Sequence, residues 1–216
     1  MAEEYECIDT FDTKPSNPYL NWTMERVRAA MTTCLQTPTQ TVLEHGVSVW
    51  DHFRLLHDHF TSGTSLPIWW RVPQWAYTPG LIDLLMPLDV VEEYILNHDC
   101  SKPIVLQVDE DGRRHFPGHA KASRQVWLAV GGNPVAARLM GMDMDAHLLK
   151  AEGIAEFASR PEATTLLLTA LAEVHSNAAM FGGVESDGFK IKAKHLDKRG
   201  RQVVAAMNWE DAREAA

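Results

Sequence analysis

The sequence has little cysteine, no long apolar run and no excess of positive charge. Its three cysteines form no CxxC pair, which argues against a disulfide framework and favours a reducing compartment. No apolar stretch approaches the length of a membrane span, and the acidic start MAEEYECIDTF has no apolar signal core. The formal net charge of −9 argues against non-specific binding of nucleic acid. We therefore expect a cytoplasmic protein that acts away from membranes.

Several common catalytic fingerprints are also missing. The glycine pairs in VGGN (130–133) and FGGVES (181–186) lack the spacing of a dinucleotide-binding fingerprint. Neither a P-loop nor a GxSxG nucleophile motif occurs, and no zinc-finger spacing is found. Candidate chemistry therefore has to come from other residue types.

Helical periodicity is what the sequence does contain, over most of its length. A length of 216 residues and an apolar content of 45% fit one globular domain. Amphipathic patterns and helix-end signals predict helices at about 21–37, 39–61, 80–86, 88–98, 118–131, 143–158 and 161–181. We therefore expect an all-α fold, a compact helical bundle.

The segments outside these helices divide the chain into three parts. Residues 1–20 are interpreted as an N-terminal arm, and the helical domain spans residues 21–185. An insertion at about 62–80 carries the Trp- and Pro-rich stretch SLPIWWRVPQWAYTPG, and its prolines predict an ordered excursion across the surface. Weak strand character appears in PIVLQV, before the turn DEDG. The tail, 186–216, alternates apolar and basic residues, so we expect either a short β hairpin or an extended C-terminal segment.

Histidines are the main candidates for a functional site. Five of them lie on the inward faces of five predicted helices: His45, His98, His119, His147 and His175. Burying an imidazole without a partner costs free energy, so a shared metal ion that accepts the imidazole lone pairs is an economical explanation. His98 and Asp99 are adjacent and can reach one ion only near a helix end, which Pro103 predicts. Mixed nitrogen and oxygen ligands favour Mn²⁺, Fe²⁺, Co²⁺, Ni²⁺ or Zn²⁺ over Ca²⁺.

The stretch from NHDCSKP (97–103) to GHAKAS (118–123) resembles the HD-domain metal-dependent phosphohydrolase superfamily. Its closest likeness is to the branch with the pattern HDxGKP…GHxxxS, which includes HD domains attached to tRNA nucleotidyltransferases, and the match extends over about residues 39–180. The resemblance implies an HD-domain-like helical bundle whose metal ligands include His45, His98 and Asp99. It adds His119 and His147 in members that hold two ions.

The chain departs from this family pattern at two places. The family closes its ligand set with an aspartate on a late helix, but the stretch LLTALAEVHSNAAMF presents His175 there. His175, Asp143 and Asp145 are therefore alternative candidates for the last ligand. Ser101 stands where the family has glycine, a change that affects the turn after the His-Asp pair.

The resemblance implies hydrolysis of a phosphate ester or anhydride by water that one or two divalent ions activate. Asp99 is then both a ligand and the group that orients or deprotonates the water. Lys102 is placed to pair with a phosphate. The substrate implied is a small molecule, a nucleotide or a related phosphate ester.

Four further residues are candidates for substrate contacts: Trp70, Arg71, Lys121 and Arg124. Trp70 and Arg71 fall in the insertion, where they either form a lid over a nucleobase and its phosphate or fasten the insertion to the core. Lys121 and Arg124 lie near His119, and each is either a phosphate contact or ordinary surface charge.

Two other functions fit the same residues. Some members of the superfamily are mixed-valent di-iron oxygenases, and the histidine-rich pattern here keeps that alternative open. A non-catalytic HD fold that binds a nucleotide or a protein partner is the other, because the late aspartate is missing.

Overall fold

The structure, a computed structural model, describes residue 19 and residues 21–207. Apart from Tyr19, the predicted N-terminal arm lies outside the described residues, and so does the end of the predicted tail, 208–216. The described chain consists mainly of helices, with two small antiparallel hairpins. This confirms the predicted all-α fold class.

Helix α2 (Val42–Ser62) is the central element of the fold. It starts with a capping box in which the Thr41 hydroxyl accepts a hydrogen bond from the Glu44 amide, and the Glu44 carboxylate accepts one from the Thr41 amide. It ends at Gly63, whose φ of 69° lies in the left-handed region that favours glycine. Its buried residues repeat at helical spacing and include Val42, His45, Val49 and Leu56, as the sequence predicts.

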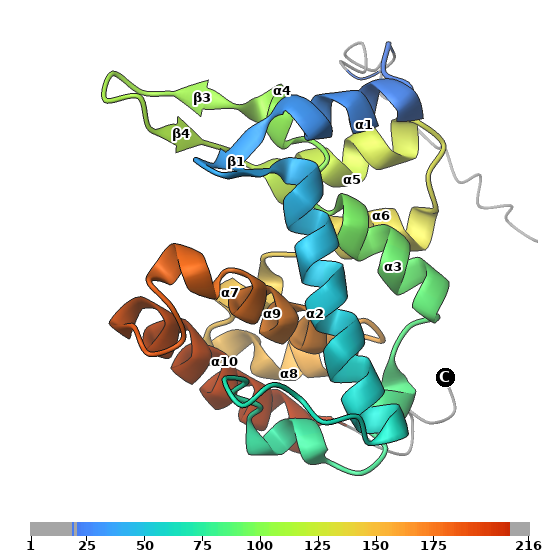
Figure 1. The fold of residues 1–216 in the computed structure, drawn as a ribbon. Helices are drawn as coiled ribbons and strands as arrows, with labels where there is room; N and C mark the ends of the chain where they lie inside the picture. Colours follow the sequence, from blue (N-terminus) through green and yellow to red (C-terminus); the bar gives the residue numbers. More distant parts are fainter. Residues whose placement is uncertain (1–18, 20, 208–216) are drawn as a thin grey trace, which may run out of the picture.

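Two groups of helices flank α2 (Figure 1). The first comprises α1 (Met24–Thr33), α3 (Leu88–Asn97), α4 (Lys102–Val105), α5 (His119–Ala129) and α6 (Pro134–Gly141). The second comprises α7 (Asp145–Leu148), α8 (Ile154–Ala158), α9 (Ala163–Ser176) and α10 (Asp187–Ala206). Helix α2 packs on α1 and α3 on one side and on α9 on the other. Residues near the start of α2 therefore meet side chains from both groups.

Two short hairpins lie beside the first group of helices. Strands β1 (Leu35–Thr37) and β2 (Gln40–Thr41) connect α1 to α2. Strands β3 (Gln107–Val108) and β4 (Arg114–His115) connect α4 to α5. The predicted DEDG turn joins β3 to β4. The strand character predicted for PIVLQV is confined to its last two residues, which form β3, whereas its first three residues belong to α4. The helix expected to reach residue 37 ends at Thr33.

The Trp- and Pro-rich insertion follows α2 and contains a short 3-10 helix, η1 (Gln74–Tyr77). A second 3-10 helix, η2 (Ile82–Leu84), follows the insertion. Trp70 and Trp75 are buried. A Cβ on Gly200 of α10 would lie 2.3 Å from the Trp75 ring, so this tryptophan packs directly on the helix backbone. The insertion is an ordered excursion, as predicted, and it is fastened to the second group of helices.

The C-terminal segment corrects the prediction of a hairpin or extended tail. Residues 187–206 form α10, which packs on α9 and α8. Ser186 caps it by accepting a hydrogen bond from the Phe189 amide. The residues that it buries recur at helical spacing: Phe189, Leu196, Gly200, Val203 and Val204. The alternation in FKIKAK covers only the first turns and does not extend to this longer stripe.

Two further differences concern the middle of the chain. Helix α6 was not expected, and the helix expected over 143–158 is divided into α7, a 3-10 turn (Ala151–Gly153) and α8. Among the described residues, no helix combines the length and the apolar character needed to cross a bilayer.

Candidate metal centre

A close helix crossing brings the first two candidate ligands together. His45 lies in the first turn of α2, and His98 caps the C-terminus of α3. A Cβ on Gly46 would lie 2.4 Å from the carbonyl oxygen of Leu96, so α2 and α3 approach this closely only because residue 46 is glycine. The rings of His45 and His98 are consequently 5.2 Å apart between centroids.

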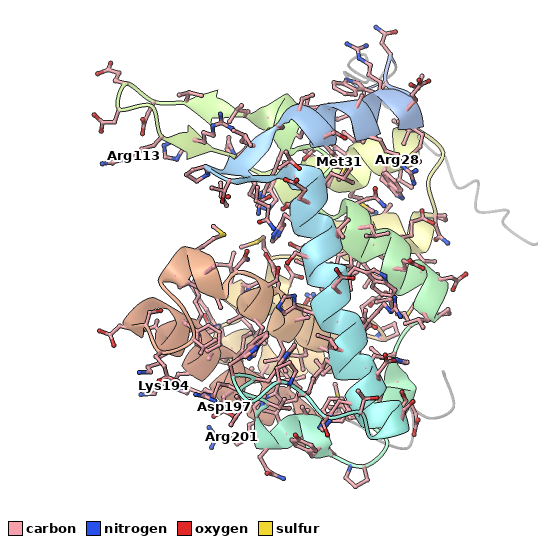
Figure 2. All side chains as sticks on the ribbon, in the orientation of Figure 1. Arg28, Met31, Arg113, Lys194, Asp197 and Arg201 are labelled. Carbon is pink, nitrogen blue, oxygen red and sulfur yellow. The ribbon has the colours of Figure 1, made fainter. Side chains whose placement is uncertain are left out.

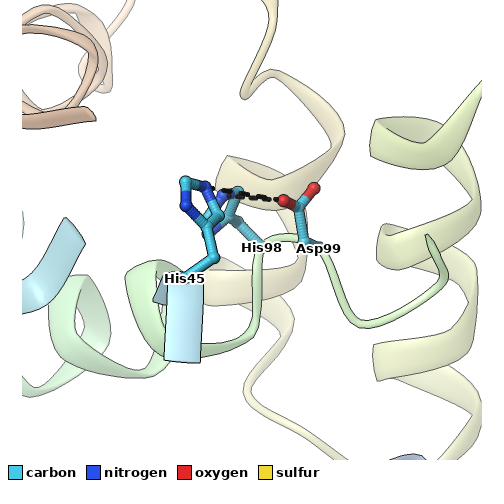
Figure 3. Close-up of side chains that lie close together, drawn as sticks. All are labelled: His45, His98 and Asp99. Atoms are coloured by element: carbon cyan, nitrogen blue, oxygen red, sulfur yellow. Dashed lines mark ion pairs between the residues drawn. The ribbon is translucent and has the colours of Figure 1, made fainter. Parts of the chain in front are cut away.

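Asp99 completes a buried cluster with these histidines (Figure 3). Helix α3 ends at Asn97, which confirms the predicted helix end and lets adjacent residues face one point. Asp99 Oδ2 lies 3.3 Å from His98 Nε2 and 3.7 Å from His45 Nε2. One potential ligand atom from each of the three residues lies within 4.8 Å of the others, and the three are at most 3% exposed.

The polar atoms of the cluster are short of hydrogen-bond partners. Among the described residues, both ring nitrogens of His45, Nε2 of His98 and Oδ1 of Asp99 are buried and have none. Buried polar atoms without partners are costly and rare. His98 Nδ1 lies 2.7 Å from the Ile95 carbonyl and donates its hydrogen there, so Nε2 is the nitrogen that faces the cluster and that offers a lone pair when its own proton leaves. The donor set therefore fits a divalent cation, and the His45–His98–Asp99 group could hold one.

Electrostatics at the cluster favour positive charge. Burial opposes a charge on His98, but the nearby carboxylates of Asp99, Asp143 and Glu173 outweigh it and raise the pKa of His98 to about 10. Burial likewise opposes ionisation of Asp99, yet Lys102 and His98 hold the pKa of its carboxyl far below the usual range. The same field that holds a proton on His98 would stabilise a cation in its place.

Glu173 is a member of the site that sequence reasoning missed. It lies on α9, and its Oε1 is 3.7 Å from His45 Nε2 while its Oε2 is 2.9 Å from His147 Nε2. It thus brings a carboxylate from a late helix to the cluster. Glu173 is the only acidic or basic side chain of α9 apart from histidine, in ATTLLLTALAEVHS. A lone charge in an otherwise apolar helix was the available signal.

The two aspartates considered for the last ligand have different positions. Asp143 is buried and accepts a hydrogen bond of 2.7 Å from the Tyr94 hydroxyl. Burial, with a smaller contribution from the charge of Glu173, raises the pKa of Asp143. Asp145 instead forms an ion pair of 2.6 Å with Arg160. Asp143 therefore borders the centre, and Asp145 does not replace the late carboxylate.

His119 reaches the cluster from α5. Its Nε2 lies 3.6 Å from Asp99 Oδ1, and its Nδ1 lies 3.0 Å from the Phe116 carbonyl, which leaves the lone pair on Nε2. Ser101, which stands in the family's glycine position, donates a hydrogen bond from its hydroxyl to the His119 carbonyl. Ser123 donates to the Ser101 hydroxyl and accepts from the Ser101 amide. These two serines fasten the turn after Asp99 to the start of α5.

His175, a candidate for the last ligand, has its ring nitrogens bonded to groups outside the cluster. Its Nδ1 lies 2.8 Å from the Leu171 carbonyl, and its Nε2 accepts a hydrogen bond of 3.0 Å from the Arg71 amide. Its ring also stacks on Trp70, with centroids 4.0 Å apart. Nδ1 carries the hydrogen, and the lone pair on Nε2 accepts the Arg71 hydrogen bond, so in this arrangement the ring directs no lone pair at the cluster. Burial lowers the pKa of His175 to about 4, which keeps the ring neutral.

The predicted substrate residues of the insertion are used for packing. Trp70 is 7% exposed against His175, and the Arg71 guanidinium pairs with Glu185. This placement corresponds to the second interpretation of the insertion, fastening to the core. Lys121 and Arg124 lie on the exposed side of α5, and the Arg124 side chain lies against Gly141.

Exposure shows from which side the centre can be reached. His45, His98 and Asp99 form a closed floor. The side chains of Lys102 and His119 are 12% and 19% exposed, and Lys102 Nζ lies 2.6 Å from Asp99 Oδ2. Lys102 and His119 therefore form a rim, defined here as the accessible edge of the centre.

Comparisons of the chain with protein-family models, curated proteins and solved structures find no significant match. The relation of this chain to the HD-domain superfamily is therefore supported only by its helical fold and by the His45–His98–Asp99 cluster. A mostly helical structure with a buried His45–His98–Asp99 group that could bind metal is compatible with an HD-domain fold.

Proposed function

We propose that the protein is a metal-dependent phosphohydrolase that acts on a nucleotide or a related small phosphate ester. The observation that carries the proposal is the convergence of partnerless atoms of His45, His98 and Asp99 on one buried point, beside a lysine. Buried groups of this kind without an internal partner are typical of functional sites.

His45, His98 and Asp99 would hold the ion, with His119 and Glu173 as the next nearest donors. A divalent cation there supplies a Lewis acid that polarises a phosphoryl oxygen and makes a water more acidic. Carboxylate and imidazole donors suit Mn²⁺, Fe²⁺, Co²⁺, Ni²⁺ or Zn²⁺. The family resemblance supports the same ligand assignment.

Lys102 supports the choice of a phosphate substrate. Its ammonium is at the rim, paired with Asp99 but partly exposed, so an anionic group that arrives at the centre meets a positive charge. Asp99 can orient the attacking water through Oδ1, which has no partner among the described atoms of the protein. The burial of the floor excludes bulk water from the same point.

His119 is placed to handle the leaving group. In hydrolysis, the water oxygen forms a bond to phosphorus, the ester P–O bond breaks, and the leaving oxygen takes up a proton. His119 Nε2 faces the centre from the rim, and an imidazole in that position can carry this proton. The ester group would then extend past His119 toward solvent.

The test is phosphate release from a panel of nucleotides and simple phosphate esters with Mn²⁺, Co²⁺, Ni²⁺, Mg²⁺ or Zn²⁺ added. We expect metal-dependent release that Asp99→Ala abolishes and that Asp83→Asn preserves, because Asp83 is an exposed residue of η2. Absence of release with every metal would overturn the proposal. Bound metal is measured in parallel by elemental analysis.

A di-iron oxygenase is the second candidate, and one observation favours it. Glu173 lies between His45 and His147, so a further histidine-carboxylate pair adjoins the first cluster. Two ions bridged by a carboxylate are one use of such a pair. Two equivalents of bound iron and O₂ consumption that depends on substrate would favour this function. Nucleotide binding without turnover under any condition would favour the non-catalytic alternative.

A further inference from the structure

A cavity lies between the two hairpins, apart from the metal-binding cluster. It has a volume of about 380 Å³, within the range of ~300–1,000 Å³ usual for small-molecule sites. Figure 1 shows β1 beside β4, and Arg114 of β4 donates a hydrogen bond to the Leu35 carbonyl of β1. The residues that line the cavity are Leu35, Gln36, Thr37, Pro38, Gly112, Arg113 and Arg114.

Both hairpins are joined by short segments to the metal centre. The Cys34 carbonyl, at the start of β1, accepts a hydrogen bond of 2.9 Å from the Val42 amide, three residues before His45. On the other side, β4 leads into Phe116, whose carbonyl holds His119 Nδ1. The ring of Phe116 also lies 5.3 Å from Lys102 Nζ. The rim of the centre is therefore the base of the β3–β4 hairpin.

The electrostatic environment of Cys34 also indicates that the β3–β4 hairpin lies near the metal centre. Burial raises the pKa of the Cys34 thiol, and the charge of Arg114 opposes this. The charges of Lys102 and Asp99 also act on this thiol. A single side chain next to the cavity thus experiences charges from both the hairpin and the metal centre.

The cavity offers two kinds of recognition. Arg114 uses one nitrogen to bind Leu35, and this holds its planar guanidinium in place, with further N–H groups for an anion. Figure 2 shows Arg113 beside the β3–β4 hairpin. Its side chain is 75% exposed, and its ion pair with Asp111 spans 3.8 Å, which is a weak contact in solvent. Gln36 Oε1 is buried and has no partner among the described residues, so it requires a donor such as an amino or hydroxyl group.

The three acidic residues of the β3–β4 turn, 109–111, are not among the residues that line the cavity. Asp109 accepts hydrogen bonds from the backbone amides of Asp111 and Arg113, and it pairs with His115 at 2.9 Å. Its charge is thus used to shape the turn. The arginines and the partnerless oxygen of Gln36 are the groups left for a ligand.

We propose that the cavity between the hairpins binds the nucleoside and inner phosphate of a nucleoside diphosphate or longer polyphosphate, with the terminal phosphate at the metal centre. This rests on the proposed function and names its substrate class. Arg114, assisted by Arg113, holds the inner phosphate, and Gln36 accepts a hydrogen bond from the nucleoside. These residues take the selective role that the sequence suggested for Trp70 and Arg71.

The test is calorimetric binding of ADP, GDP, CDP and UDP, each alone, with EDTA and with Mn²⁺. We expect at least one of them to bind, and Arg114→Gln to weaken its binding about tenfold or more, since a hydrogen bond to a charged group contributes that much. The matched control is Arg54→Gln, which removes the same charge from an exposed position of α2 and should leave binding unchanged. The corresponding monophosphate should bind more weakly and respond less to Arg114→Gln.

A second variant guards against a general effect on folding. Gln36→Leu leaves the Arg114–Leu35 contact in place and should also weaken diphosphate binding, while thermal unfolding shows whether each variant is folded. The proposal is overturned if no diphosphate binds in either condition, or if both variants bind as the wild type does. If Arg114→Gln weakened the binding of the monophosphate and of the diphosphate by the same factor, the assignment of Arg114 to the inner phosphate would be overturned.

The same experiment separates this proposal from the proposed function. Diphosphate binding that depends on Arg114, without phosphate release under any metal, would support the nucleotide site between the hairpins and contradict the proposed phosphohydrolase function. Release from simple esters without any diphosphate binding would retain the hydrolase and reject the cavity.

Discussion

The candidate metal centre and the Trp- and Pro-rich insertion both contain buried histidine contacts, and they differ in how the ring nitrogens of these histidines are satisfied. In the insertion, the Arg71 amide bonds to His175, and the Arg71 guanidinium pairs with Glu185. At the centre, nitrogens of His45 and His98 are buried without partners among the described residues. The bonded ring of His175 is used for packing, whereas the open nitrogens that His45 and His98 direct at one carboxylate are available to a ligand. Residue type alone does not make this distinction.

The largest expected effect belongs to the insertion. Trp70→Ala should lower the free energy of unfolding by about 3–5 kcal/mol, because it removes a buried aromatic ring stacked on His175. Bound metal per folded protein should not change. Trp69→Ala is the matched control, since Trp69 is 36% exposed. This variant should lower the free energy of unfolding by less than Trp70→Ala does. Urea unfolding with elemental analysis measures both, and metal loss in Trp70→Ala would contradict the separation of the two regions.

The second effect concerns pH and His175. The pKa of this ring is about 4 in the folded protein and 6.5 as its ordinary value. The unfolded chain therefore takes up the proton first, and stability falls as pH decreases from about 6.5 to about 4. A shift of this size corresponds to roughly 3 kcal/mol.

His175→Gln isolates this contribution, because glutamine does not titrate. The difference in unfolding free energy between pH 6.5 and 4.5 should be smaller in the variant than in the wild type, as measured by urea unfolding at both values. Equal differences would show that other groups carry the pH dependence.

At the centre, His45→Ala should weaken binding of Mn²⁺ or Zn²⁺ by about a hundredfold or more. It removes a fully buried ligand, and loss of mere supporting contacts already costs ~10–100-fold. Titration calorimetry with the metal alone measures the change. His57→Ala, on the same helix but half-buried elsewhere, should bind as the wild type does. Affinity retained in His45→Ala would remove this residue from the ligand set.

The smallest expected effect tests the helix crossing. Gly46→Ala places a methyl group 2.4 Å from the Leu96 carbonyl and should cost about 1–3 kcal/mol of stability by overpacking. It should also weaken metal binding, because α2 and α3 must separate. Gly153→Ala meets Leu149 at an ordinary 3.4 Å and serves as the control for unfolding and metal titration. Metal affinity unchanged in Gly46→Ala would show that the crossing does not position His45.

Local signals in the sequence were sufficient for part of this structure. The His-Asp pair before Pro103 marks a helix end, and the periodic face of α2 is buried as expected. Helix α6 was missed although Asn133 and Pro134 are a standard cap and first residue. The alternating hexapeptide FKIKAK predicts an extended segment, whereas the buried stripe that defines α10 becomes visible only over the whole of residues 187–206.

The members of the candidate metal centre could not be fully predicted, because they depend on contacts between segments that are distant in the sequence. His147 and His175 both lie on inward faces, and only the fold shows that one meets Glu173 while the other meets Arg71. Glu173 was overlooked because an aspartate was sought. The partners of a buried side chain depend on distant segments, and sequence spacing within one helix does not specify them.

The ion pair between Lys102 and Asp99 implies an order of loading. The ammonium lies 2.6 Å from the carboxylate oxygen that faces both His45 and His98. Lys102 thus acts as an internal counter-ion, and a cation that binds this oxygen competes with it for the same negative charge. Once displaced, Lys102 is a free positive charge at the rim, which suits an anion. For the proposed phosphohydrolase, electroneutrality favours metal first and phosphate second, so phosphate affinity is expected to rise with metal occupancy.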